Sequence, residues 1–218
     1  MFRRKKMFIT LEGIEGSGKT TQIPFISEFL NKNQIKNITT REPGDTEIGK
    51  DIRSILLNSA KSIDPLTELL LYSADRAEHI KSVILPSIKK NISIICDRFI
   101  DSTIVYQGYG RKIDFKTIDI IHSIESFNIK PDITFLLDLD PQTGLNRTFK
   151  DVNTGKRSTD QMRFENEKID FHNRIREGYL KIAASEPDRV KIIDGNLEIK
   201  DITEQILFHL NKLVNTGK

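Results

Sequence analysis

Eight consecutive residues near the start of the chain have the types and spacing needed to hold phosphate groups. They are Gly13, Ile14, Glu15, Gly16, Ser17, Gly18, Lys19 and Thr20, which fit G-x-x-x-x-G-K-[ST] at every fixed position. The glycines allow a tight turn that points backbone N–H groups at phosphate oxygens, and a helix beginning near Lys19 adds its positive end. We expect Lys19 to reach the terminal phosphates of a nucleoside triphosphate, Thr20 to bind Mg²⁺, and Thr21 to belong to the same pocket. A chance glycine-rich turn is the alternative.

Three further groups each carry an arginine where a ligand would face the protein. They are Arg41-Glu42-Pro43-Gly44, Asp75-Arg76 and Asp97-Arg98-Phe99. Arginine suits bidentate phosphate recognition and keeps its charge at any working pH. One such arginine could belong to an ordinary ion pair, but three at equivalent places indicate a second anionic ligand beside the loop.

The elements that must position these residues are short apolar strands alternating with longer helical patterns, which is typical of a parallel sheet. The expected strands are residues 8–12, 38–41, 93–97, 133–138 and 190–194. The expected helices are residues 21–31, 66–90, 115–127, 143–149, 169–184 and 202–214, with Pro86 bending or breaking the second. Three strands end in Asp, at the sheet edge where ligands bind in such folds. The polar stretch 150–163 is expected to be a loop inside the same domain.

Composition limits the possible partners. The 218 residues are 37% hydrophobic and 30% charged, as in a globular chain long enough for one domain, residues 1–218. The 34 basic and 31 acidic residues leave a net charge of only +3, so neither a nucleic-acid nor a membrane partner is expected. No apolar run approaches the ~20 residues of a membrane span. The single cysteine, Cys96, excludes an intramolecular disulfide and fits a reducing cytoplasm.

The phosphate-binding loop alone leaves several classes of nucleotide-binding protein open. A GTPase would need a guanine-reading N-K-x-D sequence, and the chain has none. Its length leaves little room for a motor or a helicase. A small kinase with an anionic acceptor accounts for the arginines, whereas a nucleotide-dependent switch or binding module leaves them unexplained.

Five segments make the chain similar to the thymidylate kinase family over about residues 7–214. They are residues 12–21, 41–44, 69–76, 97–108 and 171–179. The run 97–108 resembles the family's D-R-Y-x-x-S-x-x-A-Y-Q-G, with Phe99 in place of Tyr and Val105 in place of Ala. Asp45 stands where many members have a second Gly after R-E-P-G. The resemblance implies a bacterial-type thymidylate kinase with a three-layer α/β P-loop NTPase fold, a five-stranded parallel sheet flanked by helices, and a small lid at about residues 150–163.

The resemblance also implies how the substrates bind. ATP and Mg²⁺ would occupy residues 13–21 with Arg147 beside them, and dTMP would be the acceptor. Glu15 would lie near the sugar 3′-hydroxyl and needs a cationic partner such as Arg41 or Arg98; a solvent-facing loop residue is the alternative. Tyr72 and Arg76 share a helix face, so the ring would stack on thymine while the guanidinium bonds its edge; core packing is the alternative for the ring. The remaining expected acceptor residues are Pro43, Ser102, Thr103, Tyr106 and Gln107.

Neutralising charge is the expected catalytic task, because two polyanions must meet. The acceptor phosphate has a second pKa of about 6, so no general base is needed, and the four histidines are expected to be surface or packing residues. Lys19, Arg98, Glu15 and a lid arginine, Arg157, are the expected catalytic residues, although a solvated charge is the alternative for Arg157. Asp97 would either hold Mg²⁺ through water or orient Arg98.

Two further points stay open at the level of sequence. A kinase for another acceptor is the first alternative to a thymidylate kinase, since only the resemblance specifies thymidylate. Family members are usually homodimers, and the apolar faces of residues 66–90 and 115–127 could supply that interface or belong to the core.

Overall fold

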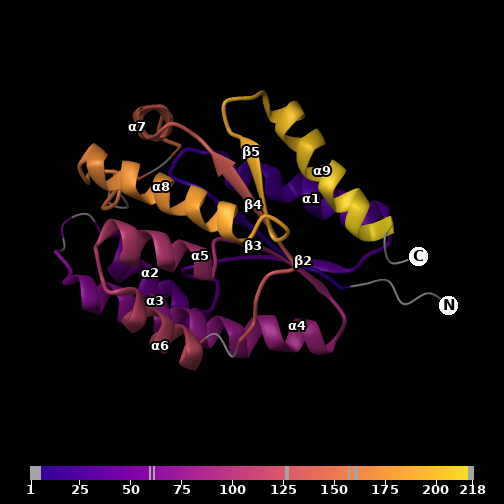
Figure 1. Ribbon diagram of the computed structural model, residues 1–218, viewed down its shortest axis with the longest axis horizontal. Coiled ribbons are helices and arrows are strands. Elements are labelled where there is room, and N and C mark those ends of the chain that lie inside the picture. The colour runs from indigo at the N-terminus through magenta and orange to yellow at the C-terminus, as the bar shows by residue number, and fades with distance from the viewer. Residues whose placement is uncertain are drawn as a thin grey trace.

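A sheet of five parallel strands forms the middle layer of the computed structural model (Figure 1), which describes residues 6–58, 60, 62–125, 128–156, 158–159 and 162–215. The strands are β1 (Phe8–Glu12), β2 (Asn37–Arg41), β3 (Ser93–Asp97), β4 (Ile133–Asp138) and β5 (Val190–Asp194). Their order in the sheet is β2-β3-β1-β4-β5, so β1 lies at the centre. All five expected strands are confirmed, and β2 begins one residue earlier than expected.

Helices cover both faces of this sheet, because its strands carry apolar side chains on both sides. On one face, α1 (Lys19–Lys32) and α9 (Ile199–Asn215) pack against β1, β3 and β4. On the other lie α8 (Ile169–Ser185) and the helices that follow β2 and β3 (Figure 1). The central strand divides its side chains accordingly: Ile9 and Leu11 join the core under α1 and α9, while Phe8 packs with Phe99 on the opposite face.

The structure contains helical segments that the sequence reading missed. Helix α2 (Glu47–Leu57) begins at Thr46, whose side chain accepts a hydrogen bond from the Gly49 amide at 2.9 Å. Its buried residues Ile52 and Leu56 are four apart, a spacing that would have indicated the helix. After β3, α5 (Ile100–Thr103) continues into the π-helical segment η2 (Ile104–Gly110). The hydrogen bond from the Arg111 amide to the Tyr106 carbonyl, 2.8 Å, spans five residues and marks the wider turn.

The long helical pattern at residues 66–90 is divided into three parts. Helix α3 (Pro65–His79) starts at Asp64, whose carboxylate caps it, and leads into the π-helical segment η1 (Ile80–Ile84). Helix α4 (Leu85–Lys89) follows, with Pro86 in its first turn. The expected break at Pro86 is wrong, because the backbone stays helical from Ile80 to Lys89. Proline has no N–H to donate, and the wider turns of η1, which end with the Leu85 amide bonded to the Ile80 carbonyl, directly precede it.

The remaining helices fix the position of the lid. Helix α6 (Phe115–Glu125) packs on α3, and α7 (Pro141–Asn153) begins at the Asp140 cap. Residues 150–153 therefore belong to α7, so the expected loop at 150–163 was placed four residues too early. Every helix in the described part of the chain is too short or too polar to cross a lipid bilayer.

Replacing Phe135, which is fully buried in β4, by alanine tests the core under α1 and α9. We expect Phe135→Ala to lower the free energy of unfolding by about 3–5 kcal/mol, because the large cavity would be only partly refilled. The matched control is Phe208→Ala on α9, where the ring is 57% exposed. Urea denaturation should show a change within about 0.5 kcal/mol for the control. Equal losses for both variants would contradict this core assignment.

Candidate active site

A cavity of about 1070 Å³ lies over the carboxyl ends of β1, β2 and β3. It is lined by the loop after β1, the segment after β2, α3, the turn after β3, η2, the start of the lid and the β5–α9 connection. The expected site residues in its lining are Glu15, Gly16, Ser17, Gly18, Lys19, Thr20, Thr21, Arg41, Pro43, Tyr72, Arg76, Asp97, Arg98, Ser102, Thr103, Tyr106, Gln107 and Arg147. Gly13 and Ile14 are outside that lining, and Arg157 lies outside the described residues.

The phosphate-binding loop closes around the side chain of its own lysine. Lys19 Nζ donates hydrogen bonds to the carbonyl oxygens of Gly13 at 3.0 Å and Ile14 at 2.8 Å. Burial, followed by the charge of Arg98, lowers the pKa of Lys19 to about 8. Gly13 has a φ of +140°, and a Cβ there would lie 2.6 Å from the Leu137 carbonyl oxygen in β4. The loop therefore fits against β4 only with glycine at this position.

Two side-chain oxygens meet beside the loop. Thr20 Oγ1 donates a hydrogen bond to Asp97 Oδ2 at 2.7 Å, joining the start of α1 to the end of β3. Hydroxyl and carboxylate oxygens are the hard ligands that Mg²⁺ takes, usually together with waters and substrate phosphates. The residues present thus fit a magnesium site beside the phosphate-binding loop.

Arg98 joins the loop after β1 to α5, η2 and α8. Its Nη2 lies 3.2 Å from Glu15 Oε1, while its Nη1 donates to Ser102 Oγ at 3.2 Å and to Tyr179 Oη at 3.1 Å. Its guanidinium carbon is 4.9 Å from the centre of the Tyr106 ring. Of the two arginines expected to partner Glu15, Arg98 is the one that pairs with it.

Glu15 carries a negative charge although it lies close to a phosphate site. Burial raises the pKa of its carboxyl, but the His172 ring and the charges of Arg98 and Lys19 outweigh burial and hold the pKa well below its ordinary value. Tyr106 donates its hydroxyl to Glu15 Oε1, and His172 Nδ1 lies 3.6 Å from the other carboxylate oxygen. The ionised carboxylate therefore has a fixed position between the loop, η2 and α8.

The helix face that carries Tyr72 and Arg76 opens into the same cavity. Arg76 is 1% exposed, and its Nε donates to Glu42 Oε2 at 2.8 Å while its Nη2 donates to the Phe99 carbonyl at 3.1 Å. His79 Nδ1 lies 2.8 Å from Glu42 Oε1. These contacts fix the guanidinium, so Glu42 supports Arg76 rather than facing solvent.

Other expected acceptor residues are held by partners that the sequence did not reveal. Gln107 Nε2 donates to Glu68 Oε1 of α3 at 2.7 Å, and both side chains are buried. Pro43 is fixed through its carbonyl oxygen, which accepts a hydrogen bond from Arg53 Nη1 at 2.8 Å. Phe164, from the far end of the lid, packs edge-on against the Tyr106 ring at 5.4 Å.

Arg147 lies at the base of the lid, on α7. Its Nη1 donates to the Gly195 carbonyl at 3.0 Å and approaches the Gly16 carbonyl at 3.5 Å. It thus connects the phosphate-binding loop to the β5–α9 connection. Lys150, Asp151 and Lys156 also line the cavity, so the end of α7 and the described part of the lid after it contribute charged side chains to the site.

Sequence reasoning missed the functional setting of two histidines. His79 and His172 were expected to be surface or packing residues, but both are buried and contact carboxylates of the cavity. Helical spacing could have found His79, because it lies three residues after Arg76 on the same helix. His172 contacts Glu15 from a distant helix, and no spacing along the chain marks it.

Gly13→Ala tests whether the close fit of the loop against β4 supports nucleotide binding. A side chain there adds backbone strain of about 1–3 kcal/mol to a clash with the Leu137 carbonyl, so we expect the affinity for Mg·ATP to fall at least about tenfold. Gly155→Ala is the control, since Gly155 also has a positive φ of +71° but has open space around it. Titration calorimetry should show near-unchanged nucleotide affinity for the control, and similar losses in both variants would contradict the explanation.

Comparison with known proteins identifies the family. The Thymidylate kinase family model matches residues 11–206. Proteins named thymidylate kinase from Desulforapulum autotrophicum and Desulfosudis oleivorans are 49% and 46% identical to the chain; the matches cover 94% and 97% of this chain and 91% and 100% of theirs. A crystal structure of thymidylate kinase from Ehrlichia chaffeensis has a TM-score of 0.73 and 36% identity, covering 95% of this chain and 99% of that one.

The order β2-β3-β1-β4-β5, the phosphate-binding loop and the arginine-lined cavity agree with these matches, which extend over nearly the whole chain. The expected α/β fold with a five-stranded parallel sheet flanked by helices is confirmed. The chain therefore belongs to the thymidylate kinase family and is a dTMP kinase, a phosphotransferase.

Proposed function

We propose that this dTMP kinase transfers the γ-phosphoryl group of Mg·ATP to the phosphate of dTMP within the described cavity, giving ADP and dTDP. The observation that carries the proposal is the position of Arg98, which lies between the acid of the phosphate-binding loop and the helices that line the acceptor side. From there, one guanidinium can face both polyanions and offset their repulsion.

On the donor side, residues 13–20 bind the triphosphate through backbone N–H groups, and Lys19 turns from the loop carbonyls to the β- and γ-phosphates. Thr20 and Asp97, whose side-chain oxygens meet beside the loop, would hold Mg²⁺. When bound, Mg²⁺ neutralises part of the phosphate charge. Arg147 flanks the nucleotide at the base of the lid.

On the acceptor side, Tyr72 and Arg76 recognise the thymine. Arg76 has fixed geometry because Glu42 and the Phe99 carbonyl hold it, which suits a hydrogen bond to the base edge. Arg41 contacts the acceptor phosphate, and Glu15 faces the sugar 3′-hydroxyl. The residues that complete this pocket are Pro43, Ser102, Thr103, Tyr106 and Gln107.

No general base is required, because the acceptor phosphate is largely dianionic at neutral pH, with a second pKa of about 6. Catalysis then consists of alignment and charge neutralisation by Lys19, Arg98 and, from the lid, Arg157. Closure of the lid over the two substrates excludes water and limits hydrolysis of ATP.

A coupled assay of ADP release with Mg·ATP and a panel of nucleoside monophosphates tests this assignment. We expect turnover to favour dTMP and to fall at least about 100-fold in both Lys19→Ala and Arg98→Ala, since each removes charge neutralisation that strengthens in the transition state. Lys181→Ala, a surface lysine paired with Glu177 on α8, is the control and should retain full activity. ADP release indifferent to the monophosphate would refute the assignment.

We also propose that the active protein is a homodimer formed through α3 and α6. These neighbouring helices carry exposed apolar side chains: Leu66 and Leu70 on α3 are 49% and 51% exposed, and Ile120 and Ile124 on α6 are 62% and 72% exposed. A second copy would remove this apolar surface from water.

Leu70→Glu is expected to convert the dimer to a monomer, because an isologous contact would bring the two new carboxylates into an apolar interface. Light scattering after size exclusion should change from twice the chain mass of 25.0 kDa to that mass alone. The matched change Phe208→Glu on α9, where the ring is 57% exposed, should leave the mass unchanged. A wild-type protein that elutes as a monomer at micromolar concentration would contradict the proposal.

A further inference from the structure

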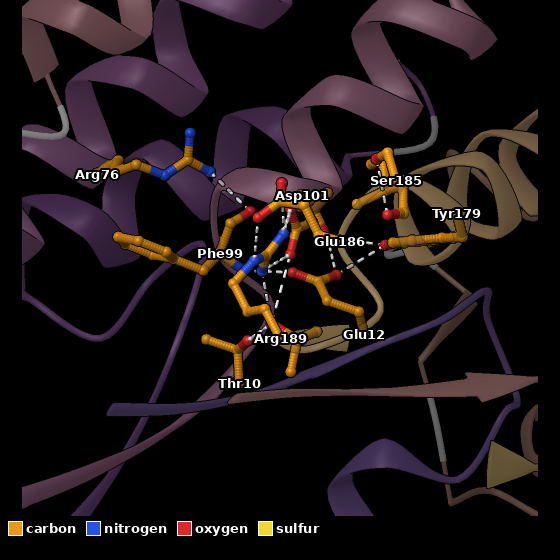
Figure 2. A network of polar contacts seen from close by, with 12 residues as sticks. Thr10, Glu12, Arg76, Phe99, Asp101, Tyr179, Ser185, Glu186 and Arg189 are labelled. Carbon is orange, nitrogen blue, oxygen red and sulfur yellow. Dashed lines mark hydrogen bonds and ion pairs between the residues drawn. The ribbon is translucent and has the colours of Figure 1, made fainter. Parts of the chain in front are cut away.

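A fully buried carboxylate lies beneath the catalytic arginine, at the point where β1 enters the phosphate-binding loop. Glu12 is 0% exposed and does not line the cavity, so it touches neither substrate in the proposed mechanism. Figure 2 shows its carboxylate pointing at the backbone of Phe99 and at the Tyr179 hydroxyl. A buried carboxylate is costly unless it is well bonded, so its contacts indicate what it does.

Glu12 accepts three hydrogen bonds from segments far away in the sequence. Its Oε1 accepts from the Phe99 amide at 2.8 Å, and its Oε2 accepts from Ser102 Oγ at 2.6 Å and from Tyr179 Oη at 2.8 Å. These donors come from the turn after β3, from α5 and from α8. One carboxylate thus connects three elements at the floor of the site.

The two hydroxyls are also the partners of Arg98. Its Nη1 donates to Ser102 Oγ at 3.2 Å and to Tyr179 Oη at 3.1 Å. A hydroxyl has one proton and two lone pairs. When Ser102 and Tyr179 give their protons to Glu12, they present lone pairs to the guanidinium. Arg98 itself has a φ of +71°, an unfavourable backbone conformation that the adjacent Phe99–Glu12 bond helps to hold.

We propose that Glu12 is a positioning residue for phosphoryl transfer: as an acceptor it orients the Ser102 and Tyr179 hydroxyls, which in turn fix Arg98 between the two substrates. The inference rests on the role proposed above for Arg98. The orientation in which the Arg98 guanidinium faces the substrates is then set by a residue that never contacts them. Removing the acceptor capacity of Glu12 should therefore lower the rate of transfer more than it lowers binding of ATP.

The charged surroundings make this orientation depend on pH. Burial, and next the negative charge of Asp101 on α5, raise the pKa of Glu12 to about 7, although Arg98 and the two hydroxyls oppose the shift. Asp101 is itself paired with Arg189 at 2.7 Å (Figure 2). The other titratable groups that act on Glu12 are Tyr179 on α8, Lys19 on α1 and Cys96 on β3.

Protonated Glu12 and glutamine share one defect, which makes Glu12→Gln the informative variant. An ionised carboxylate accepts hydrogen bonds at both oxygens, whereas a protonated carboxyl or a glutamine amide has an O–H or NH₂ group in place of one of them. Either the Phe99 amide or the pair of hydroxyls therefore faces a donor where it had an acceptor. We expect kcat of Glu12→Gln at pH 8.5 to be about 10- to 100-fold below wild type, the range for loss of a partner that orients a functional group. The KM for ATP should change by less than about threefold, because the loop that binds ATP keeps its own contacts.

The pH profile separates this role from a merely structural one. As pH falls from 8.5 to 6, wild-type Glu12 takes up a proton and loses the acceptor that glutamine already lacks. The ratio of wild-type kcat to Glu12→Gln kcat, in which titration of the substrate phosphate cancels, should therefore decrease towards one. A ratio that stays constant across this range overturns the inference.

Further variants keep the test decisive if Glu12→Gln folds poorly. Tyr179→Phe removes one of the two linked hydroxyls without touching the carboxylate and should reduce kcat, so wild-type kcat in this variant overturns the inference. Where the double variant folds, adding Tyr179→Phe to Glu12→Gln should reduce kcat by less than the product of the two single reductions. Asp101→Asn is the control, because it breaks a buried ion pair in the same network but leaves the three Glu12 bonds in place. It should lower the thermal midpoint while retaining most of kcat.

Arg98→Ala, assayed in parallel, distinguishes failure of the positioning role of Glu12 from failure of the proposed role of Arg98. Suppose that Arg98→Ala loses activity. A pH-independent kcat ratio for Glu12→Gln, or multiplicative losses for Glu12→Gln and Tyr179→Phe, then refutes the positioning role and leaves the proposed role of Arg98 intact. A fully active Arg98→Ala enzyme refutes both.

Discussion

The ion pair between Arg98 and Glu15 is the interaction on which the organisation of the site depends. It connects the loop after β1 to the turn after β3, two segments that are adjacent because β1 and β3 are paired in the sheet. A phosphate site needs positive charge, but cationic side chains that lie close together repel one another when no ligand is bound. Glu15 balances Arg98 and Lys19 and holds the guanidinium near the entrance of the loop.

The elements around this pair provide rigidity rather than further chemistry. The π-helical turn of η2 lets Tyr106 reach Glu15 while its neighbour Gln107 reaches Glu68 on α3. Wide helical turns of this kind cost backbone regularity and recur at functional sites, where they re-aim side chains. Here the turn connects the phosphate-binding loop to α3 through two consecutive residues.

Local sequence patterns predicted those parts of the site that depend on neighbours along the chain. The phosphate-binding loop, Asp97 at the end of β3, and the shared helix face of Tyr72 and Arg76 all follow from spacing, and the structure brings them to one cavity. The aspartates that end β4 and β5, Asp138 and Asp194, lie outside its lining. Contacts between distant segments could not be predicted in this way. Glu12 bonds Tyr179 across 167 positions, and no pattern along the chain records that contact.

The contrast between local patterns and contacts of distant segments bears on the other differences between the expected and the observed structure. Helix α2 was missed although its apolar spacing was visible, because its short amphipathic pattern lies next to a loop-like segment rich in Gly, Asp and Thr. His172 was assigned no function because its partner, Glu15, belongs to an element at the other end of the chain. Resemblance to the family supplied the expected roles, whereas the physical reasons for them, such as the fixed guanidinium of Arg76, needed the folded structure.

The central claim is that Glu15 and Arg98 act as one unit during phosphoryl transfer. A double-mutant cycle of Glu15→Gln and Arg98→Ala, measured as the single-turnover rate of transfer from labelled ATP to dTMP, tests it most directly. The account predicts that Glu15→Gln slows transfer strongly in the wild-type background and has little further effect when Arg98 is already absent. Rate losses that multiply in the double variant would show that the two residues act independently and would contradict the account.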